Sequence, residues 1–279
     1  MNGLEFLRQQ CHRPADAVRW ACLLEATAPK PGNVSPGRDF SDLRYQDFVV
    51  AAELTADAFE SERDSFSRSI LAASESIASR LATNVNLGIL LLLAPLAQVD
   101  QSAERRLSRS TWQAEVSRLL SGCDDSDCQR VYRAIAVSKP GGMGQVEHGD
   151  VSEPPTMGLI DAMKLAQDRD SIARNYANGF QSLFHETVPI VQHAIETRGD
   201  VLAGISEAAV QLLSTQPDSL ILRKNGAEVA GEVQRWAEFP FDNEVERERF
   251  DRKLRASKFN PGTTADLIAA SLYILLREK

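Results

Sequence analysis

The most apolar stretch of the chain reads Leu87-Gly88-Ile89-Leu90-Leu91-Leu92-Leu93-Ala94-Pro95-Leu96. Even when it is extended to Val99, this stretch is shorter than the ~20 apolar residues that a membrane-spanning helix requires. We therefore expect a buried central helix. Pro95 is expected to kink or end it, because proline lacks the N–H group that a helix interior uses and its ring clashes with the preceding turn.

Apolar residues on both sides of this stretch recur at intervals of three and four, which is typical of amphipathic helices. No segment shows the sustained alternation that half-buried strands require. The expected helices cover residues 14–27, 42–59, 65–81, 112–120, 128–137, 157–167, 171–184, 189–199, 201–213, 243–256 and 264–276. Since neither a repeat nor a composition shift marks a boundary, the sequence predicts one compact all-α domain over residues 1–279, with roughly ten helices and the leucine-rich helix at its centre.

Composition and charge narrow the classes of function. Of the 279 residues, 43% are hydrophobic and 25% are charged, which is ordinary for a globular protein. The net charge of −8 argues against a nucleic-acid or membrane-surface binder, because both need a basic face, whereas a phosphorylated ligand needs only a local basic pocket. The four cysteines show no C-x-x-C pair or zinc-site spacing, and no signal peptide is evident, so we expect a cytoplasmic protein with reduced thiols.

The segment from Ala28 to Asp42 interrupts the helical pattern with three prolines and two glycines. It lies between two helical patterns and carries charged and amide side chains, among them Lys30, Asn33 and Asp39. Stiffened polar loops of this kind are common places for anion and metal chemistry. An ordinary polar connector is an equally good interpretation of the loop alone.

Two further polar segments precede or interrupt helices. Thr83, Asn84 and Asn86 stand directly before the leucine-rich helix, where they can cap it or can help its free N–H groups to bind phosphate. The segment 139–144, with Gly141 and Gly142, resembles a phosphate cradle in composition. It is not a Walker loop, since G-x-x-x-x-G-K-[ST] occurs nowhere in the chain.

Two more segments lie in the C-terminal third of the chain. The basic pair Arg223-Lys224 belongs to a segment, 218–226, that breaks the helical pattern, and such charged turns mostly contact solvent. In 260–266, Pro-Gly makes a turn and a threonine can cap the helix that follows, with Asp266 in its first turn. Capping does not explain Asn260, the asparagine before the proline.

Taken together, these segments resemble the triphosphoribosyl-dephospho-coenzyme A synthase family. The resemblance is carried by Pro29-Lys30-Pro31-Gly32-Asn33-Val34, Phe40-Ser41-Asp42, Thr83-Asn84-Val85-Asn86-Leu87-Gly88 and Asn260-Pro261-Gly262-Thr263-Thr264-Ala265-Asp266-Leu267, with weaker support from 168–173 and 176–180. It implies an all-helical fold and an ATP-dependent transferase in prosthetic-group biosynthesis. In the family's reaction, the ribose 2′-hydroxyl of 3′-dephospho-coenzyme A attacks C1 of the ATP ribose, adenine leaves and the triphosphate is retained.

The resemblance also implies roles for particular residues. One carboxylate among Asp39, Asp42 and Asp266 would act as base, and the others would hold Mg²⁺, with Asp39 and Asp42 as the expected metal ligands. Lys30, Arg223 and Lys224 are expected at the triphosphate, and Asn84, Asn86 and Asn260 at ribose or phosphate oxygens. The full set of expected substrate-binding residues is Lys30, Gly32, Asn33, Thr83, Asn84, Asn86, Gly141, Gly142, Arg223, Lys224, Asn260, Gly262 and Thr263.

The sequence departs from the lyase-associated members of the family at one position. Those members carry a Gly-Ser-His-x-Asp-Met-like stretch, and Phe40 here stands where they have histidine, whereas Asp42 matches their aspartate. Two other functions therefore stay open: ribosyl or phosphoribosyl transfer to a different acceptor in another cofactor pathway, and non-catalytic nucleotide binding. The expected partners are ATP and a nucleotide-like acceptor, without nucleic acid or membrane, and a homo-oligomer stays open.

Overall fold

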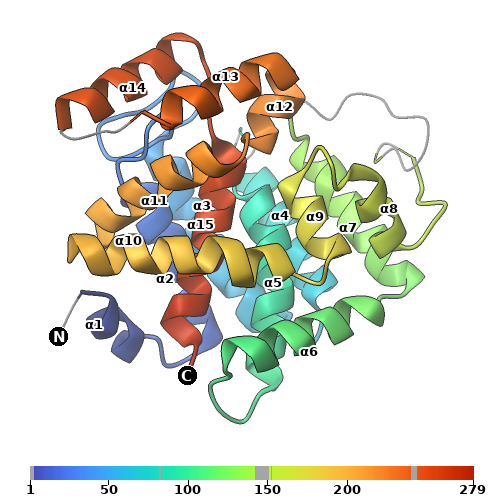
Figure 1. Cartoon of the computed structure of the whole chain (residues 1–279). Helices are drawn as coiled ribbons and strands as arrows, with labels where there is room; N and C mark the ends of the chain where they lie inside the picture. The colour runs from blue at the N-terminus through green and yellow to red at the C-terminus, as the bar shows by residue number, and fades with distance from the viewer. Residues whose placement is uncertain (1–2, 82, 84, 142–150, 152, 240–243) are drawn as a thin grey trace.

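Helices alone build the fold in the computed structural model of this chain (Figure 1). The structure describes residues 3–81, 83, 85–141, 151, 153–239 and 244–279. Within these ranges, ladder pairing is limited to one isolated bridge between Ser35 and Arg38. The predicted fold class is confirmed, and the described residues form fifteen α-helices rather than roughly ten.

The α-helices run, in chain order, over α1 Gly3–Gln10, α2 Pro14–Thr27, α3 Tyr45–Ser61, α4 Phe66–Arg80, α5 Leu87–Ser102, α6 Arg109–Ser121, α7 Asp125–Ser138, α8 Leu159–Ala166, α9 Ser171–Ala177, α10 Val188–Arg198, α11 Val201–Thr215, α12 Ser219–Asn225, α13 Ala227–Ala237, α14 Glu244–Ala256 and α15 Gly262–Arg277. A π-helical turn, η1 Leu183–Thr187, leads directly into α10. In this described part of the chain, no helix combines the length and apolarity that a membrane crossing requires.

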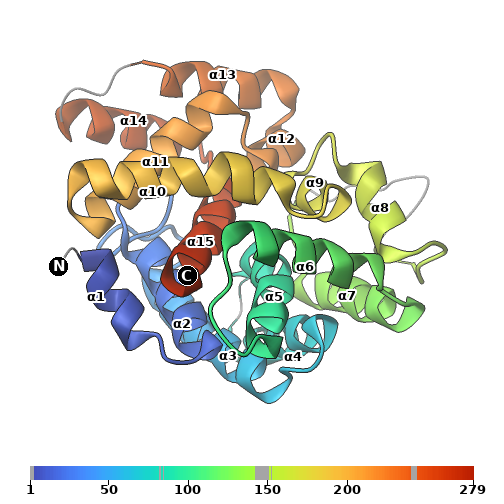
Figure 2. The same cartoon turned by 60° about the horizontal axis from the view of Figure 1, so that its bottom comes forward.

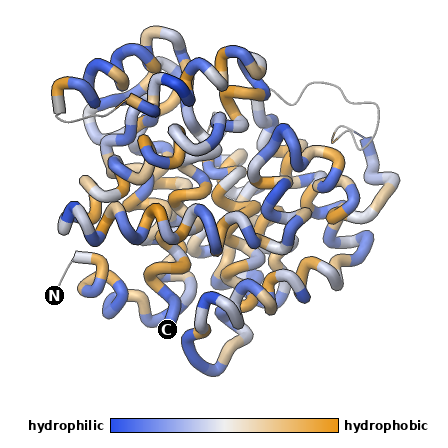
Figure 3. The backbone as a smooth tube through the Cα atoms, in the orientation of Figure 1, coloured by the Kyte–Doolittle hydropathy of each residue, from blue (hydrophilic) through white to orange (hydrophobic). Residues whose placement is uncertain are grey.

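Helices α5 and α15 form the centre of the core. Most side chains of both are buried, and α15 packs against α2, α5, α10 and α11 (Figures 1 and 2). The hydrophobic parts of the chain gather around them in Figure 3. The predicted buried leucine-rich helix is therefore confirmed. Pro95 does not end it, because packing on all sides holds α5 in place as far as Ser102.

A buried polar network fixes α5 against α15. The Oδ2 atom of Asp100 in α5 accepts hydrogen bonds from the Tyr273 hydroxyl (2.8 Å) and from Nε of Arg277 (2.7 Å). Its Oδ1 accepts a third from Nη2 of Arg277 at 3.1 Å. All three bonds lie near the C-terminal ends of the two helices. They fix the position of one helix along the other, and so fix how the N-terminal ends are placed against each other.

Several boundaries differ from the predicted ones. The expected helix over 171–184 ends at Ala177, since Gly179 and Phe180 adopt left-handed φ values of 62° and 65°. The segment 218–226, expected as a turn, is the short helix α12. Helices α1 and α13 were not predicted. Seven- to eleven-residue helices depend on caps and neighbours more than on periodicity, which explains why their patterns are weak.

Helices α12, α13 and α14 form a layer over one end of α15 (Figure 1). A second, smaller group of buried side chains holds this layer on α11: Leu213, Ile221, Ala230, Val233, Ala237, Phe250 and Leu254. The layer places the start of α12, at Asp218 and Leu220, beside the first turn of α15. The polar segments singled out in the sequence come together in this region.

Candidate functional site

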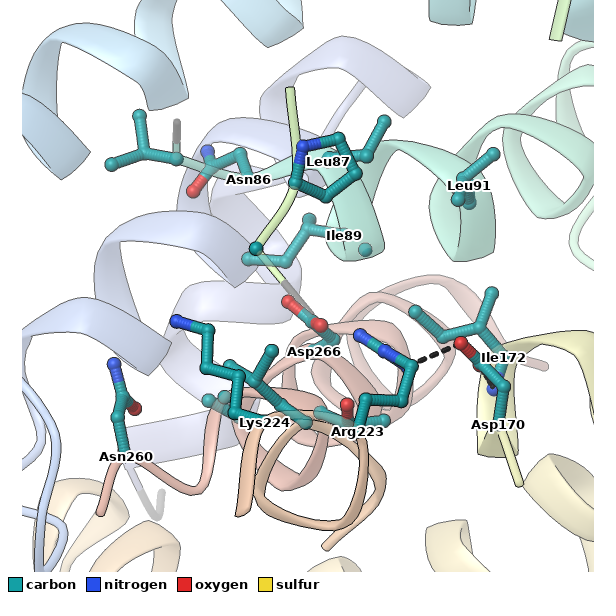
Figure 4. A pocket seen from close by; sticks show the side chains of 18 of the residues that line it. Asn86, Leu87, Ile89, Leu91, Asp170, Ile172, Arg223, Lys224, Asn260 and Asp266 are labelled. Carbon is teal, nitrogen blue, oxygen red and sulfur yellow. Dashed lines mark hydrogen bonds and ion pairs between the residues drawn. The ribbon is translucent and has the colours of Figure 1, made fainter. Parts of the chain in front are cut away.

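A pocket of about 720 Å³ opens where the first turns of α5 and α15 meet (Figure 4). Its other walls come from α8 and α9, from the end of α12, from the residues that follow α14 and from the loop between α2 and α3. Pockets of about 300–1,000 Å³ are the usual size for small-molecule sites. Its walls therefore combine most of the segments that the sequence marked as polar.

Most of the predicted site residues line this pocket: Asn33, Asp42, Thr83, Asn86, Gly141, Arg223, Lys224, Asn260, Gly262, Thr263 and Asp266. Lys30, Gly32 and Asp39 do not. Asn84 and Gly142 lie outside the described residues. The pocket thus joins segments as far apart in the chain as residues 33 and 266.

The closest approach in the site is between α5 and α15. A Cβ atom on Gly88 would lie 2.0 Å from Oδ2 of Asp266 and 2.9 Å from Cδ1 of Ile172. Only glycine leaves room for a carboxyl group at this point. The glycine of the Asn-Leu-Gly sequence at the start of α5 therefore serves to admit the Asp266 carboxyl.

Asp266 is an acid in an unusual environment. Among the described residues, none donates a hydrogen bond to its carboxyl group, which is partly buried between Gly88 and Ile172. Burial, together with the nearby acids Glu25 and Asp218, raises the pKa of Asp266 well above its usual range, and Arg223 opposes this rise only in part. The protonated form of Asp266 is favoured, so this residue can act as a proton donor.

Asp218 ties α12 to α15. Its Oδ1 accepts hydrogen bonds from the N–H groups of Leu220 (2.9 Å) and Ile221 (3.0 Å), which caps α12. Its Oδ2 accepts from the N–H (2.7 Å) and the hydroxyl (2.8 Å) of Thr264 in α15. Sequence reasoning did not find this residue as a link, although an aspartate before Ser219 is a helix-start signal. The link fixes the α12 cations relative to Asp266.

Asp170 orients one of these cations. Its Oδ1 caps α9 by accepting from the N–H of Ile172 at 2.8 Å, and its Oδ2 pairs with Nη1 of Arg223 (Figure 4). The Nε atom of Arg223 is buried and has no partner among the described residues. The guanidinium group is thus held in one orientation while it keeps a free donor.

Four more cations line the pocket: Arg255, which pairs with Asp251, and Lys224, Arg169 and Lys258. In the described part of the chain, none of the last three forms an ion pair with a carboxylate. Lys258 adopts a left-handed φ of 57° where α14 ends, a conformation that is costly for a residue with a Cβ atom. A chain of net charge −8 therefore concentrates unpaired positive charge at this pocket, as a polyphosphate ligand requires.

The loop between α2 and α3 forms one wall through Asn33 and Asp42. The Nδ2 group of Asn33 donates to Oδ1 of Asn260 at 2.8 Å, which joins the loop to the turn before α15. Asp39 instead accepts from the Tyr45 N–H at 2.8 Å and stabilises the start of α3. The N–H of Gly32 donates to Oδ1 of Asp251 at 2.8 Å, so Gly32 anchors the loop to α14.

Lys30 is buried beneath the pocket. Its Nζ atom lies 2.9 Å from Oε1 of Glu25, and it also donates to the carbonyl oxygens of Glu25 and Ala28. Its side chain is 0% exposed. Lys30 therefore neutralises Glu25, which lines the pocket, and does not itself reach the cavity.

Arg255, at the end of α14, holds the same loop and was not found from the sequence. Its guanidinium group donates to the carbonyl oxygens of Asn33 and Arg38 and to the carboxylate of Asp251. It also lies over the ring of Phe40, with Cζ 4.6 Å from the ring centroid. An isolated arginine in a highly charged helix gives no pattern that distinguishes it from its solvated neighbours.

The described residues contain no group of three or more His, Cys, Asp or Glu side chains placed to hold a metal ion. Asp42 is the predicted metal ligand that lines the pocket. Mg²⁺ in nucleotide sites commonly takes one or two carboxylates together with phosphate oxygens and water. One carboxylate at the rim fits an ion that arrives with a polyphosphate.

Fold and site together define a helical protein whose pocket combines several cations with a partly buried acid. A family profile described as CitG, ATP:dephospho-CoA triphosphoribosyl transferase, matches residues 11–279. The chain belongs to this family, whose members are ATP-dependent transferases. The sequence-based resemblance is confirmed.

A crystal structure from Archaeoglobus fulgidus, of a provisionally named triphosphoribosyl-dephospho-coA synthase, has a similar fold, with a TM-score of 0.66. It is 25% identical in sequence and the match covers 82% of this chain and 98% of that one. No curated protein matches the chain.

Proposed function

We propose that this protein transfers the triphosphoribosyl group of ATP to a ribose hydroxyl of 3′-dephospho-coenzyme A and releases adenine. The observation that carries the proposal is the Asp266 carboxyl, which has no hydrogen-bond donor among the described residues and lies beside the pocket's cations in a chain of this family. A proton donor next to a polyphosphate site suits the departure of a base from a nucleotide.

The reaction resembles glycoside chemistry, with an oxocarbenium-like transition state at C1 of the ATP ribose. The bond from C1 to adenine breaks, and a bond from C1 to the acceptor oxygen forms. In our proposal Asp266 gives its proton to a ring nitrogen of the departing adenine, and a carboxylate takes the proton of the acceptor hydroxyl. No other bond breaks or forms, so the triphosphate stays on the transferred ribose.

Glu25 is the carboxylate that we assign as base. It lines the pocket, is near enough to influence Asp266, and forms an ion pair with Lys30. This assignment replaces a direct phosphate contact by Lys30 with a role for Lys30 as the counter-ion of Glu25.

We assign the triphosphate to Arg223, Lys224, Arg169 and Lys258. Mg²⁺ would be held by the phosphates with Asp42 at the rim, and there it would neutralise phosphate charge. Thr263 and Asn260, which line the same part of the pocket, would contact ribose or phosphate oxygens. The cations bind and orient, whereas Asp266 and Glu25 move protons.

The test is to incubate the protein with ATP, Mg²⁺ and 3′-dephospho-coenzyme A and to separate the nucleobases by chromatography. We expect free adenine, formed only when the acceptor is present. If ADP or AMP accumulates instead, the protein transfers a phosphoryl or adenylyl group and the proposal is wrong. Asp266→Asn should remove adenine release, and Asp161→Asn, an equivalent change at an exposed position of α8, should leave it unchanged.

A further inference from the structure

The amide of Asn86 has an unmet requirement for hydrogen bonds. Asn86 is 6% exposed and lines the pocket, yet neither its Nδ2 nor its Oδ1 has a hydrogen-bond partner in the described structure. Its side chain makes no capping hydrogen bond to α5, although the residue stands at the N-cap position in a left-handed conformation with φ of 67°. Buried polar groups are nearly always satisfied, so an unsatisfied amide at a ligand pocket indicates that the ligand satisfies it.

The chemistry of an amide limits what that ligand group is. Nδ2 needs an acceptor and Oδ1 needs a donor, side by side. A triphosphate offers acceptors only and would leave Oδ1 unpaired. The edge of adenine that carries N6 and N7 offers one donor and one acceptor at the spacing of a carboxamide, which is the pairing that asparagine makes with adenine in nucleic acids.

The position of Asn86 agrees with this choice. Leu87 and Ile89, at the start of α5, lie beside it (Figure 4). Arg223 and Lys224, from α12, flank Asp266 in the same view. A flat base fits the apolar end, and a triphosphate fits the cationic end.

We infer that Asn86 reads the base of the nucleotide by pairing with the N6 and N7 edge of adenine. The inference rests on the proposed function in that the pocket takes ATP. It places adenine at α5, the breaking glycosidic bond beside Asp266, and the triphosphate at α12. The pair also holds adenine in place as a leaving group while Asp266 protonates it. Hypoxanthine, which carries an oxygen in place of the N6 amino group, would face Oδ1 with a second acceptor.

The test compares the dissociation constants of ATP and inosine triphosphate by calorimetry with Mg²⁺ and without acceptor, so that it does not depend on turnover. The wild type should bind ATP more tightly by about 5- to 150-fold, the discrimination expected of one bidentate asparagine–adenine pair. Asn86→Gly keeps the left-handed backbone and removes the amide. It should bring the two dissociation constants to within a few-fold of each other.

Asn178→Ala is the matched control, because Oδ1 of Asn178 is also buried and unpartnered but lies outside the pocket. It should keep the preference for ATP. If Asn86→Gly weakens both nucleotides equally, Asn86 binds phosphate or only supports α5, and the inference is wrong. If Asn86→Gly weakens the binding of ATP but not that of 2′-deoxy-ATP, the amide contacts the ribose instead of the base. ATP binding with the predicted preference but without adenine release would contradict the proposed function and leave this inference standing.

Discussion

At the residue scale, one glycine and one carboxyl group account for the chemistry of the site. Gly88 leaves the space into which Asp266 projects, and burial, with the nearby acids Glu25 and Asp218, raises the pKa of that acid well above its usual range. The sequence identified both residues as parts of family-like segments. It could not show that they touch, because 178 positions separate them and only the packing of α5 on α15 brings them together.

Gly88→Ala tests this contact. Glycine to alanine in a helix normally stabilises a protein by up to ~1 kcal/mol. Here the new methyl group would overlap the Asp266 carboxyl, so we expect destabilisation by about 1–3 kcal/mol and loss of adenine release. Gly158→Ala, at a position with no atom within 4 Å of the new Cβ, is the control and should keep full activity. Thermal unfolding of Gly88→Ala at or above the wild-type midpoint would refute the close approach.

Asp266 also predicts a pH dependence with a definite sign. Its raised pKa arises from burial and from Glu25, Asp218 and Asp170, with Arg223 opposing. The folded protein keeps a proton that an unfolded chain releases above pH ~4, so the free energy of unfolding falls as pH rises toward the raised pKa, by up to about 1.4 kcal/mol per pH unit. As a proton donor, Asp266 also loses activity as the pH passes that value.

Asp266→Asn should therefore be inactive yet more stable than the wild type at neutral and alkaline pH. Denaturant unfolding of the two proteins across the pH range measures the difference. The two stability curves should converge below pH ~4, where the wild-type carboxyl becomes protonated in both states. Parallel curves would mean that Asp266 is ionised in the folded protein and is not the acid.

At the scale of elements, caps and clamps position the site more than regular periodicity does. Periodicity predicted α2 and α4 closely, because long amphipathic helices show their buried face in the sequence. It missed α12, whose seven residues are held by the Asp218 cap and by its contacts with α13 and α15. The local pattern alone suggested a solvent-facing turn for the two cations of α12, whereas the family resemblance placed them at the substrate, and in the structure both line the pocket.

The clamp between α14 and the loop over residues 30–42 gives a prediction at this scale. Arg255→Ala removes the donors to the loop carbonyls and the contact with Phe40. We expect faster hydrogen exchange in the loop and a decrease of about 10-fold or more in kcat/KM, because a misplaced loop moves Asp42 and Asn33. Arg252→Ala, on the same helix but 67% exposed and, among the described residues, paired with Glu248 alone, is the matched control. Equal exchange rates in the two variants would exclude the clamp.

At the scale of the whole molecule, an acidic helical bundle surrounds a locally basic pocket. The buried Asp100 network fixes α5 on α15 at one end, and Asp218 fixes α12 on α15 at the other. The fold class could be predicted because the helical pattern runs through nearly the whole chain. The arrangement of the walls could not, since it depends on which of fifteen helices are neighbours.

Phe40 marks how this chain differs from the lyase-associated members of its family. Its ring lies beneath Arg255 rather than offering an ionisable group, so proton transfer is assigned to Asp266 and Glu25. Lys30→Met tests that assignment by leaving Glu25 without its counter-ion. We expect its kcat to fall by about 10-fold or more with ATP binding nearly unchanged. If Lys30→Met weakens ATP binding and leaves kcat unchanged, Lys30 contacts the phosphates and is not the counter-ion of a catalytic base.

The central claim is that the bond from ribose to adenine breaks while the triphosphate stays on the ribose. The most direct measurement uses ATP that carries one isotopic label in adenine and another in the γ-phosphate. With 3′-dephospho-coenzyme A and Mg²⁺, the account predicts that the γ-phosphate label enters the acceptor while an equal amount of adenine label appears as free base. Both labels in the acceptor, or the phosphate label in pyrophosphate or inorganic phosphate, would contradict it.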